Sequence, residues 1–195
     1  MGVIGLRIYK TMIISIALLV LSIMLGCTTK YPNQKPIGEK FPEVTGQSLA
    51  NKVVKFPEHV YGKNVVLLLG YIQNSQFDID RWLIGLDMTK TQVEVFELPT
   101  IQGMLPRFFK TQIDEGMKKG IPKELWSGVV TIYQDGERMQ AFTGNINSNN
   151  ARVILLNKKG KIEYFYDEGF SVTALNSLRE RLVNIDDISP ISSER

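Results

Sequence analysis

Residues 65–70 read Val-Val-Leu-Leu-Leu-Gly, an uninterrupted apolar run that stops at a glycine. Such a run, with β-branched residues at its start, is typical of a central strand buried on both faces of a sheet. A helix is predicted next, because Ser75 can serve as its N-cap and Asp78 places an acid in its first turn. Its apolar residues recur at helical spacing along one face: Ile79, Trp82, Leu83 and Leu86. We expect the rest of the fold to be built around this strand and helix.

Strand and helix patterns alternate in the remainder of the chain. In chain order they predict strands at residues 92–98 and 128–133 with a helix within 105–117 between them, then strands at 153–156 and 161–166. The last two strands enclose a turn with Gly160 and predict a β-hairpin. Ser171 can cap a final helix, whose predicted buried stripe is Val172, Leu175, Leu178 and Leu182. This order predicts an α/β fold over residues 41–184, a three-layer sandwich with a mixed central sheet flanked by helices.

The N-terminal end has the pattern of an export signal. Arg7 and Lys10 precede an apolar run over residues 12–25, which is shorter than the roughly 20 residues that a membrane-spanning helix needs. We therefore predict a signal peptide at residues 1–26, preceding the globular domain.

The chain's one Cys, Cys27, directly follows Gly26 at the end of that run. This arrangement resembles a bacterial lipobox, and the resemblance implies that the Cys27 thiol is acylated and attached to membrane lipid. The alternative is an uncleaved anchor followed by a free Cys. Residues 27–40 are polar with two prolines and are predicted to be a tether, and residues 185–195 a flexible tail.

Composition excludes several classes of function. One Cys and one His cannot form an internal disulfide, a Cys-X-X-Cys pair or a conventional zinc site, so no metal and no cofactor are expected. Cleavage before Cys27 removes two basic residues and no acid, so the net charge falls from +3 to +1 and a nucleic-acid partner is not expected. His59 is predicted to be a loop residue rather than a ligand. Asp78 and Asp80 are predicted to be acids of a helical first turn rather than a catalytic pair.

The element order and two sets of residues resemble the thioredoxin fold in its membrane-anchored, peroxiredoxin-like branch. These residues are 38–42 with 46–49, and 153–162 followed by Gly169. A narrower resemblance, to the mitochondrial ATP synthase assembly-factor family and its bacterial relatives, rests on residues 105–110, 113–117, 120–122 and 131–133. It implies a role in assembling a membrane complex.

Two departures from the redox-active members of that fold are visible. Those members carry Cys-X-X-Cys between the first long strand and its helix, where the chain has residues 71–76 without any sulfur. Ala151 occupies the place of the family's cis-proline. A cis bond before a non-proline residue costs about 2.5–4 kcal/mol, so we expect a trans bond there. The chain therefore has no predicted catalytic residue for thiol–disulfide chemistry, and an enzyme is not the favoured interpretation.

Two segments remain as candidate binding sites. Gln73, Asn74 and Ser75 lie at a helix N-terminus, where backbone amides can accept an anion or a partner's backbone. Residues 107–123 carry five basic and two acidic residues, a balance of +3, which suits an anionic lipid surface or an acidic partner. The candidate partner-binding residues of this segment are Arg107, Phe108, Phe109, Lys110, Asp114, Gly116, Met117, Gly120, Ile121 and Pro122. The alternatives are a plain capped helix start and a helix with a solvated basic face.

Taken together, these patterns predict a lipoprotein that is exported and anchored to the bacterial cell envelope. Its thioredoxin-like domain would be redox-inactive and would bind a protein partner at the membrane surface, as an assembly or chaperone-type factor. The alternative is an enzyme without sulfur chemistry, or a small-ligand carrier, that uses the loop from Asn74 to Asp78.

Overall fold

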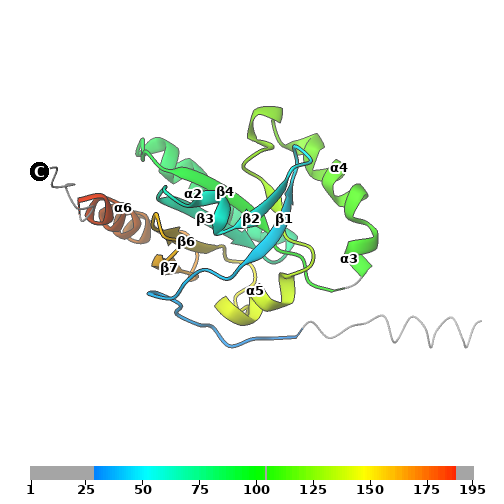
Figure 1. Cartoon of the computed structure of the whole chain (residues 1–195), viewed down its shortest axis with the longest axis horizontal. Helices are drawn as coiled ribbons and strands as arrows, with labels where there is room; N and C mark the ends of the chain where they lie inside the picture. The colour runs from blue at the N-terminus through cyan, green and yellow to red at the C-terminus, as the bar shows by residue number, and fades with distance from the viewer. Residues whose placement is uncertain (1–28, 104, 188–195) are drawn as a thin grey trace, which may run out of the picture. The chain divides into compact units, whose positions relative to one another are not determined.

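The computed structural model describes residues 29–103 and 105–187 (Figure 1). The predicted signal peptide, Cys27 and residues 188–195 of the predicted tail lie outside the described residues. One compact unit begins at Tyr31 and contains every helix and strand described below. None of the described helices is long and apolar enough to cross a membrane.

A four-stranded mixed sheet forms the centre of this unit. Its strand order is β4 (Glu94–Pro99), β3 (Val65–Gly70), β6 (Arg152–Leu156) and β7 (Ile162–Tyr166). Strand β3 runs parallel to β4 and antiparallel to β6, and β6 and β7 form an antiparallel pair. Every residue of β3 is buried, which confirms the predicted central strand at 65–70. The antiparallel pairing of β6 with β7 confirms the predicted C-terminal hairpin.

Helices cover both faces of this sheet. Alternate side chains of β3 point to opposite sides and are all apolar, so each face must be covered by other elements. Val66 and Leu68 pack in one core with apolar residues of α2 (Gln76–Met88) and α6 (Val172–Asp187). On the other face, Leu67 and Leu69 share a second core with Met139 of α5 (Gly136–Thr143) and with the N-terminal strands. The predicted three-layer α/β sandwich is therefore confirmed.

A second, smaller sheet has the order β2 (Val53–Phe56), β1 (Val44–Ser48) and β5 (Val130–Thr131). Strand β5 lies within the predicted third strand but is only two residues long. Its neighbours form parallel bridges, Val129 to Glu97 of β4 and Ile132 to Thr100 just after β4, so this segment joins the two sheets. The β1–β2 hairpin and α5 were not among the predicted elements, because their short sequences lack a clear apolar period.

The segment between β4 and β5 is helical, as predicted. It consists of α3 (Leu105–Phe108) and α4 (Lys110–Gly120), with a break at Phe109. In Figure 1, α4 and α6 lie at opposite ends of the compact unit.

The ends of the predicted domain need two adjustments. Tyr31 donates its backbone N–H to the Asn145 side chain at 2.7 Å, and Gly38 donates to the carbonyl of Ile162 at 2.8 Å. These bonds fasten residues 31–40 to the body, so the compact unit begins at Tyr31 rather than at residue 41. At the other end, α6 continues to Asp187, past the predicted boundary at residue 184.

The final helix has the predicted cap, because Ser171 Oγ accepts the Ala174 N–H at 3.1 Å. Its predicted stripe needs one correction: Val172 is 65% exposed, since it lies at the first position of the helix and faces away from the sheet. The buried residues of the stripe are Ala174, Leu175, Leu178 and Leu182.

Candidate functional site

The junction between β3 and α2 is fixed by short-range contacts. A side chain at Gly70 would place its Cβ 2.5 Å from Ser75 Oγ, so the chain needs glycine where the strand meets the next turn. Ser75 is buried and donates its hydroxyl to the Ile72 carbonyl at 2.6 Å. It occupies the predicted N-cap position of α2, but its side chain makes no capping hydrogen bond. Residues 73–75 form a 3-10 turn that leads directly into α2.

Asp78, in the first turn of α2, is buried and holds two distant segments. Its Oδ2 accepts the Ala151 N–H at 2.9 Å and its Oδ1 accepts the Phe170 N–H at 2.7 Å. The sequence pattern predicted only a first-turn role for Asp78, although its spacing of four from Trp82 places both residues on the inward face of α2. Among the described residues the Phe56–Pro57 bond is the one cis peptide, so the expected trans bond before Ala151 is confirmed.

Arg152 is a second buried charge beside this junction. Its guanidinium donates to three loop carbonyls, those of Gly144 at 3.1 Å and of Asn147 and Asn150 at 2.8 Å. It also lies 4.8 Å from the centroid of the Tyr71 ring, and its own burial lowers the pKa of Arg152. The sequence analysis missed this residue, although a single arginine at the start of an apolar strand was a visible signal.

The Tyr71 hydroxyl completes this buried polar group. It donates to the Met139 carbonyl at 3.1 Å and shares a short hydrogen bond with Thr143. Burial raises the pKa of Tyr71 to about 12. These contacts tie the end of β3 to α5, so the groups under the β3–α2 junction have a structural role.

An open cleft of about 520 Å³ lies over this junction. Its lining comes from α2 and the turn before it (Asn74, Phe77, Asp78, Arg81), the loop before β6 (Asn149, Asn150) and the turn after β7 (Glu168, Gly169, Phe170). Of the loop residues predicted as a site, Asn74 lines the cleft, whereas Ser75 is buried beneath it and Gln73 is not part of its lining. Phe77 is 71% exposed, so an aromatic ring is available at the edge of the cleft.

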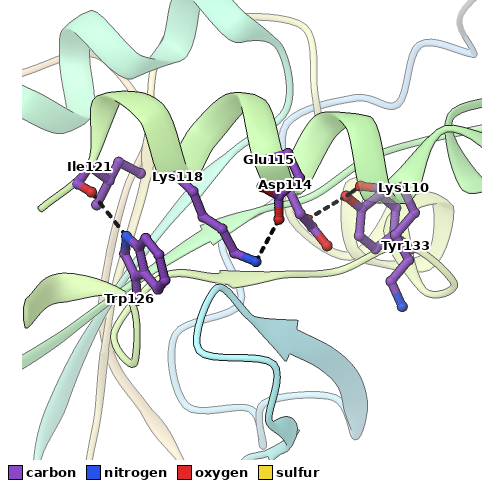
Figure 2. A network of polar contacts seen from close by, with 7 residues as sticks. All are labelled: Lys110, Asp114, Glu115, Lys118, Ile121, Trp126 and Tyr133. Carbon is purple, nitrogen blue, oxygen red and sulfur yellow. Dashed lines mark hydrogen bonds and ion pairs between the residues drawn. The ribbon is translucent and has the colours of Figure 1, made fainter. Parts of the chain in front are cut away.

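Helix α4 is fastened to the body by the contacts in Figure 2. Asp114 is buried and accepts a hydrogen bond from the Tyr133 hydroxyl at 2.7 Å. Burial, together with this bond to Asp114, raises the pKa of Tyr133. Lys118 pairs with Glu115 at 2.9 Å, and its Nζ lies 5.4 Å from the ring centroid of Trp126.

These contacts divide the predicted partner-binding residues into two groups. Asp114 is buried, and Lys110, Met117 and Ile121 are half-buried on the side of α4 that meets the body. The exposed group is Phe108, Phe109, Gly116, Gly120 and Pro122. The ten residues therefore do not form one continuous surface, because a helix distributes neighbouring residues around its axis. The structure describes the backbone of Arg107 in α3.

The other titratable residues considered from the sequence lie apart from the cleft. His59 is exposed in a 3-10 turn, with its ring edge-on to Phe56 and Phe96. Asp80 is exposed and accepts a bond from the Gln76 side chain at 2.9 Å. Within the described part of the chain, no cluster of His, Cys, Asp and Glu is placed to hold a metal ion.

Comparison with known proteins identifies the fold. A thiol peroxidase from Chromobacterium violaceum aligns over 80% of this chain and 92% of its own, with a TM-score of 0.55 and 8% identity. The chain has a thioredoxin-like fold. BsSco, a member of the Sco family of cytochrome c oxidase assembly proteins, aligns over 80% of this chain and 98% of its own, with a TM-score of 0.51 and 10% identity. No protein-family model and no curated protein matches the sequence.

The thioredoxin-like fold allows the β3–α2 junction to be compared with the position of the redox motif. The junction is the place where the resemblance puts Cys-X-X-Cys in redox-active members, and here it contains Asn74 and Ser75. A helix N-terminus lowers the pKa of a thiol and so activates it, but the chain supplies no thiol at this point. The cleft can therefore hold a ligand beside α2 without offering it a sulfur nucleophile.

Proposed function

We propose that this chain is a lipid-anchored, redox-inactive thioredoxin-like protein that binds a protein partner at the membrane surface. Acylation of Cys27, export to the cell envelope and a role in assembly are parts of this proposal. Its function would be to hold a partner segment, with no chemical step of its own.

The cleft over the β3–α2 junction is the observation that carries the proposal. Phe77 offers an exposed aromatic ring, and Asn74 and Asn149 offer exposed amides that suit the backbone of a peptide. Arg81 and Glu168 add one charge of each sign, which can orient a bound partner segment in the cleft. Asp78 keeps the walls of this cleft in place through Ala151 and Phe170.

Two likenesses are the reason for proposing an assembly role over other kinds of protein binding. The first is the resemblance predicted from residues 105–110, 113–117, 120–122 and 131–133 to the ATP synthase assembly-factor family, which no family model and no curated protein supports. The second is BsSco, which shares the fold and belongs to a family of cytochrome c oxidase assembly proteins. Because fold alone does not determine function, these likenesses select the experiment and do not replace it.

Site-specific photo-crosslinking in native membranes tests the partner. A photoreactive residue is placed at Phe77 in the cleft, at Gln112 on the exposed side of α4, and at Val183 on α6 as a control of similar exposure. We expect a reproducible protein adduct from Phe77 and none from Val183. An adduct from Gln112 alone would move the partner to α4, and no adduct from either position would refute protein binding.

Reduction of insulin disulfides tests the absence of redox chemistry. We expect no acceleration over dithiothreitol alone, because the chain's one Cys lies at position 27 and none lies near α2. Clear catalysis by the purified protein would refute the redox-inactive interpretation.

A small-ligand carrier is the second candidate, and the size of the cleft favours it. About 520 Å³ falls within the range of roughly 300–1,000 Å³ that is usual for small-molecule sites. Native mass spectrometry of protein purified from its host would detect a bound molecule. Loss of that molecule in Arg81→Glu, with no loss in Asp87→Lys at the other end of α2, would support the carrier.

A further inference from the structure

The tetrad Arg107-Phe108-Phe109-Lys110 places two aromatic residues between two basic residues, at the point where α3 meets α4. The two rings are the most accessible apolar groups of this segment, with 75% of Phe108 and 56% of Phe109 exposed. The fold holds them in this position, because α4 is fastened through Asp114 and Tyr133 (Figure 2). Exposed aromatic residues flanked by cations have the chemistry of a membrane-interface contact.

The first residues of the compact unit lie at the same edge of the sheet. Strands β3 and β4 are parallel and β6 is antiparallel to them, so the ends of β3 and β4 and the start of β6 share one edge. The segment after β4 leads to α3, and the loop before β6 binds Tyr31 through Asn145.

A second set of contacts links Tyr31 to the start of α3. The Tyr31 hydroxyl donates to Glu137 at 3.0 Å, in the first turn of α5. The preceding residue, Gly136, packs so closely on the Ile101 carbonyl that an added Cβ would lie 2.1 Å from that oxygen. Ile101 is four residues before the start of α3 at Leu105. Tyr31 is thus linked through α5 to the segment that leads from β4 into α3.

The length of chain before Tyr31 then restricts the orientation of the domain. Tyr31 lies four positions after Cys27. At no more than about 3.6 Å per residue, this stretch spans roughly 14 Å when fully extended. This step rests on the proposed acylation of Cys27: an anchored Cys27 keeps the edge that carries Tyr31 close to the lipid surface.

We propose that Phe108 and Phe109 insert into the interface of a membrane that contains anionic lipid, while Lys110 and Lys119 contact the lipid headgroups. Lys119 is exposed on α4. Lys110, beside the aromatic pair, is half-buried with its Nζ 5.8 Å from the centroid of the Tyr133 ring, so only part of its side chain is accessible to headgroups. The acids of this helix oppose them weakly, since Asp114 is buried under Tyr133 and Glu115 is paired with Lys118. The lipid contact orients the cleft beside α2, which lies at the same edge of the sheet, toward partners embedded in the membrane.

Depth-dependent fluorescence quenching tests this contact in the full lipidated protein. Phe108→Cys is labelled with an environment-sensitive fluorophore, and Met88→Cys, which is 78% exposed at the far end of α2, is the matched control. Each protein is reconstituted in vesicles of phosphatidylcholine with and without phosphatidylglycerol, carrying a nitroxide lipid. We expect quenching at position 108 to exceed that at position 88 by on the order of twofold or more in the anionic vesicles.

Three results would overturn the proposal. Equal quenching at positions 108 and 88 would show that the aromatic pair stays in water. Quenching at position 108 that does not depend on phosphatidylglycerol would remove the role of the lysines. Photo-crosslinking from position 108 to a protein in native membranes would assign the pair to a protein interface instead. The mass of the N-terminal peptide reports acylation of Cys27 separately, so failure of the anchor and failure of the lipid contact are distinguishable.

Discussion

Removing the Asp78 carboxylate should destabilise the protein far more than removing any exposed acid of the same helix. Its two oxygens accept backbone N–H groups from residues 73 and 92 positions away along the chain. In Asp78→Ala both amides lose their acceptor, and the loop before β6 and the turn after β7 lose their common attachment to α2.

The contacts give the size of the effect. A hydrogen bond to a charged group contributes about 1.5–3 kcal/mol, so two such bonds contribute about 3–6 kcal/mol before relaxation. Relief of the buried carboxylate's desolvation reduces this, and we expect a loss of about 3–4 kcal/mol in the free energy of unfolding. At roughly 2–4 °C per kcal/mol for a chain of this size, Tm falls by about 6–16 °C. Asp78→Asn should lose about half as much free energy, because its amide oxygen can still accept one bond.

Urea unfolding followed by the fluorescence of the buried Trp82 measures this loss. Asp80→Ala is the matched control, since Asp80 is exposed on the same helix and should change the free energy by under about 0.5 kcal/mol. Amide hydrogen exchange should also accelerate at Ala151 and Phe170 in Asp78→Ala. A loss below about 1 kcal/mol, or unchanged exchange at both amides, would refute the structural role assigned to Asp78.

Three further predictions follow from buried groups and glycines. Arg152→Met should lower the free energy of unfolding by about 3 kcal/mol, because three loop carbonyls lose a charged donor; equal urea midpoints for mutant and wild type would contradict this. Gly136→Ala should lower the free energy of unfolding by about 2 kcal/mol or more, because the added Cβ would meet the Ile101 carbonyl. Gly116→Ala should raise it by about 1 kcal/mol through helix propensity, because the space around Gly116 is open. The pKa of Tyr71 is raised to about 12, so the folded state favours the neutral phenol: this stabilisation is complete below pH 10 and is lost as the pH rises to 12. Between pH 9 and 12, Tm should therefore decline less in Tyr71→Phe than in wild type. Equal declines in Tm would show that groups other than Tyr71 cause the loss of stability at high pH.

Local sequence determined the elements whose pattern is complete within a few residues. The run at 65–70 had to be a buried strand, because apolar side chains occupy both faces of the pleat. The spacing of Ile79 and Trp82 defined the inward face of α2, and the turn at Gly160 defined the C-terminal hairpin. The same local evidence excluded a thiol at the β3–α2 junction, because an absent residue type needs no tertiary contact to be recognised.

Only the tertiary structure decided which polar side chains matter and which surfaces are free. Asp78 and Arg152 act on backbone groups of loops that the fold brings beside them, and hydrophobic periodicity carries no information about such partners. The sequence grouped Asp114 with Phe108 in one binding surface. The packing of α4 buries the first against Tyr133 and leaves the second exposed, because the direction of a helix face is fixed only by what the helix packs against.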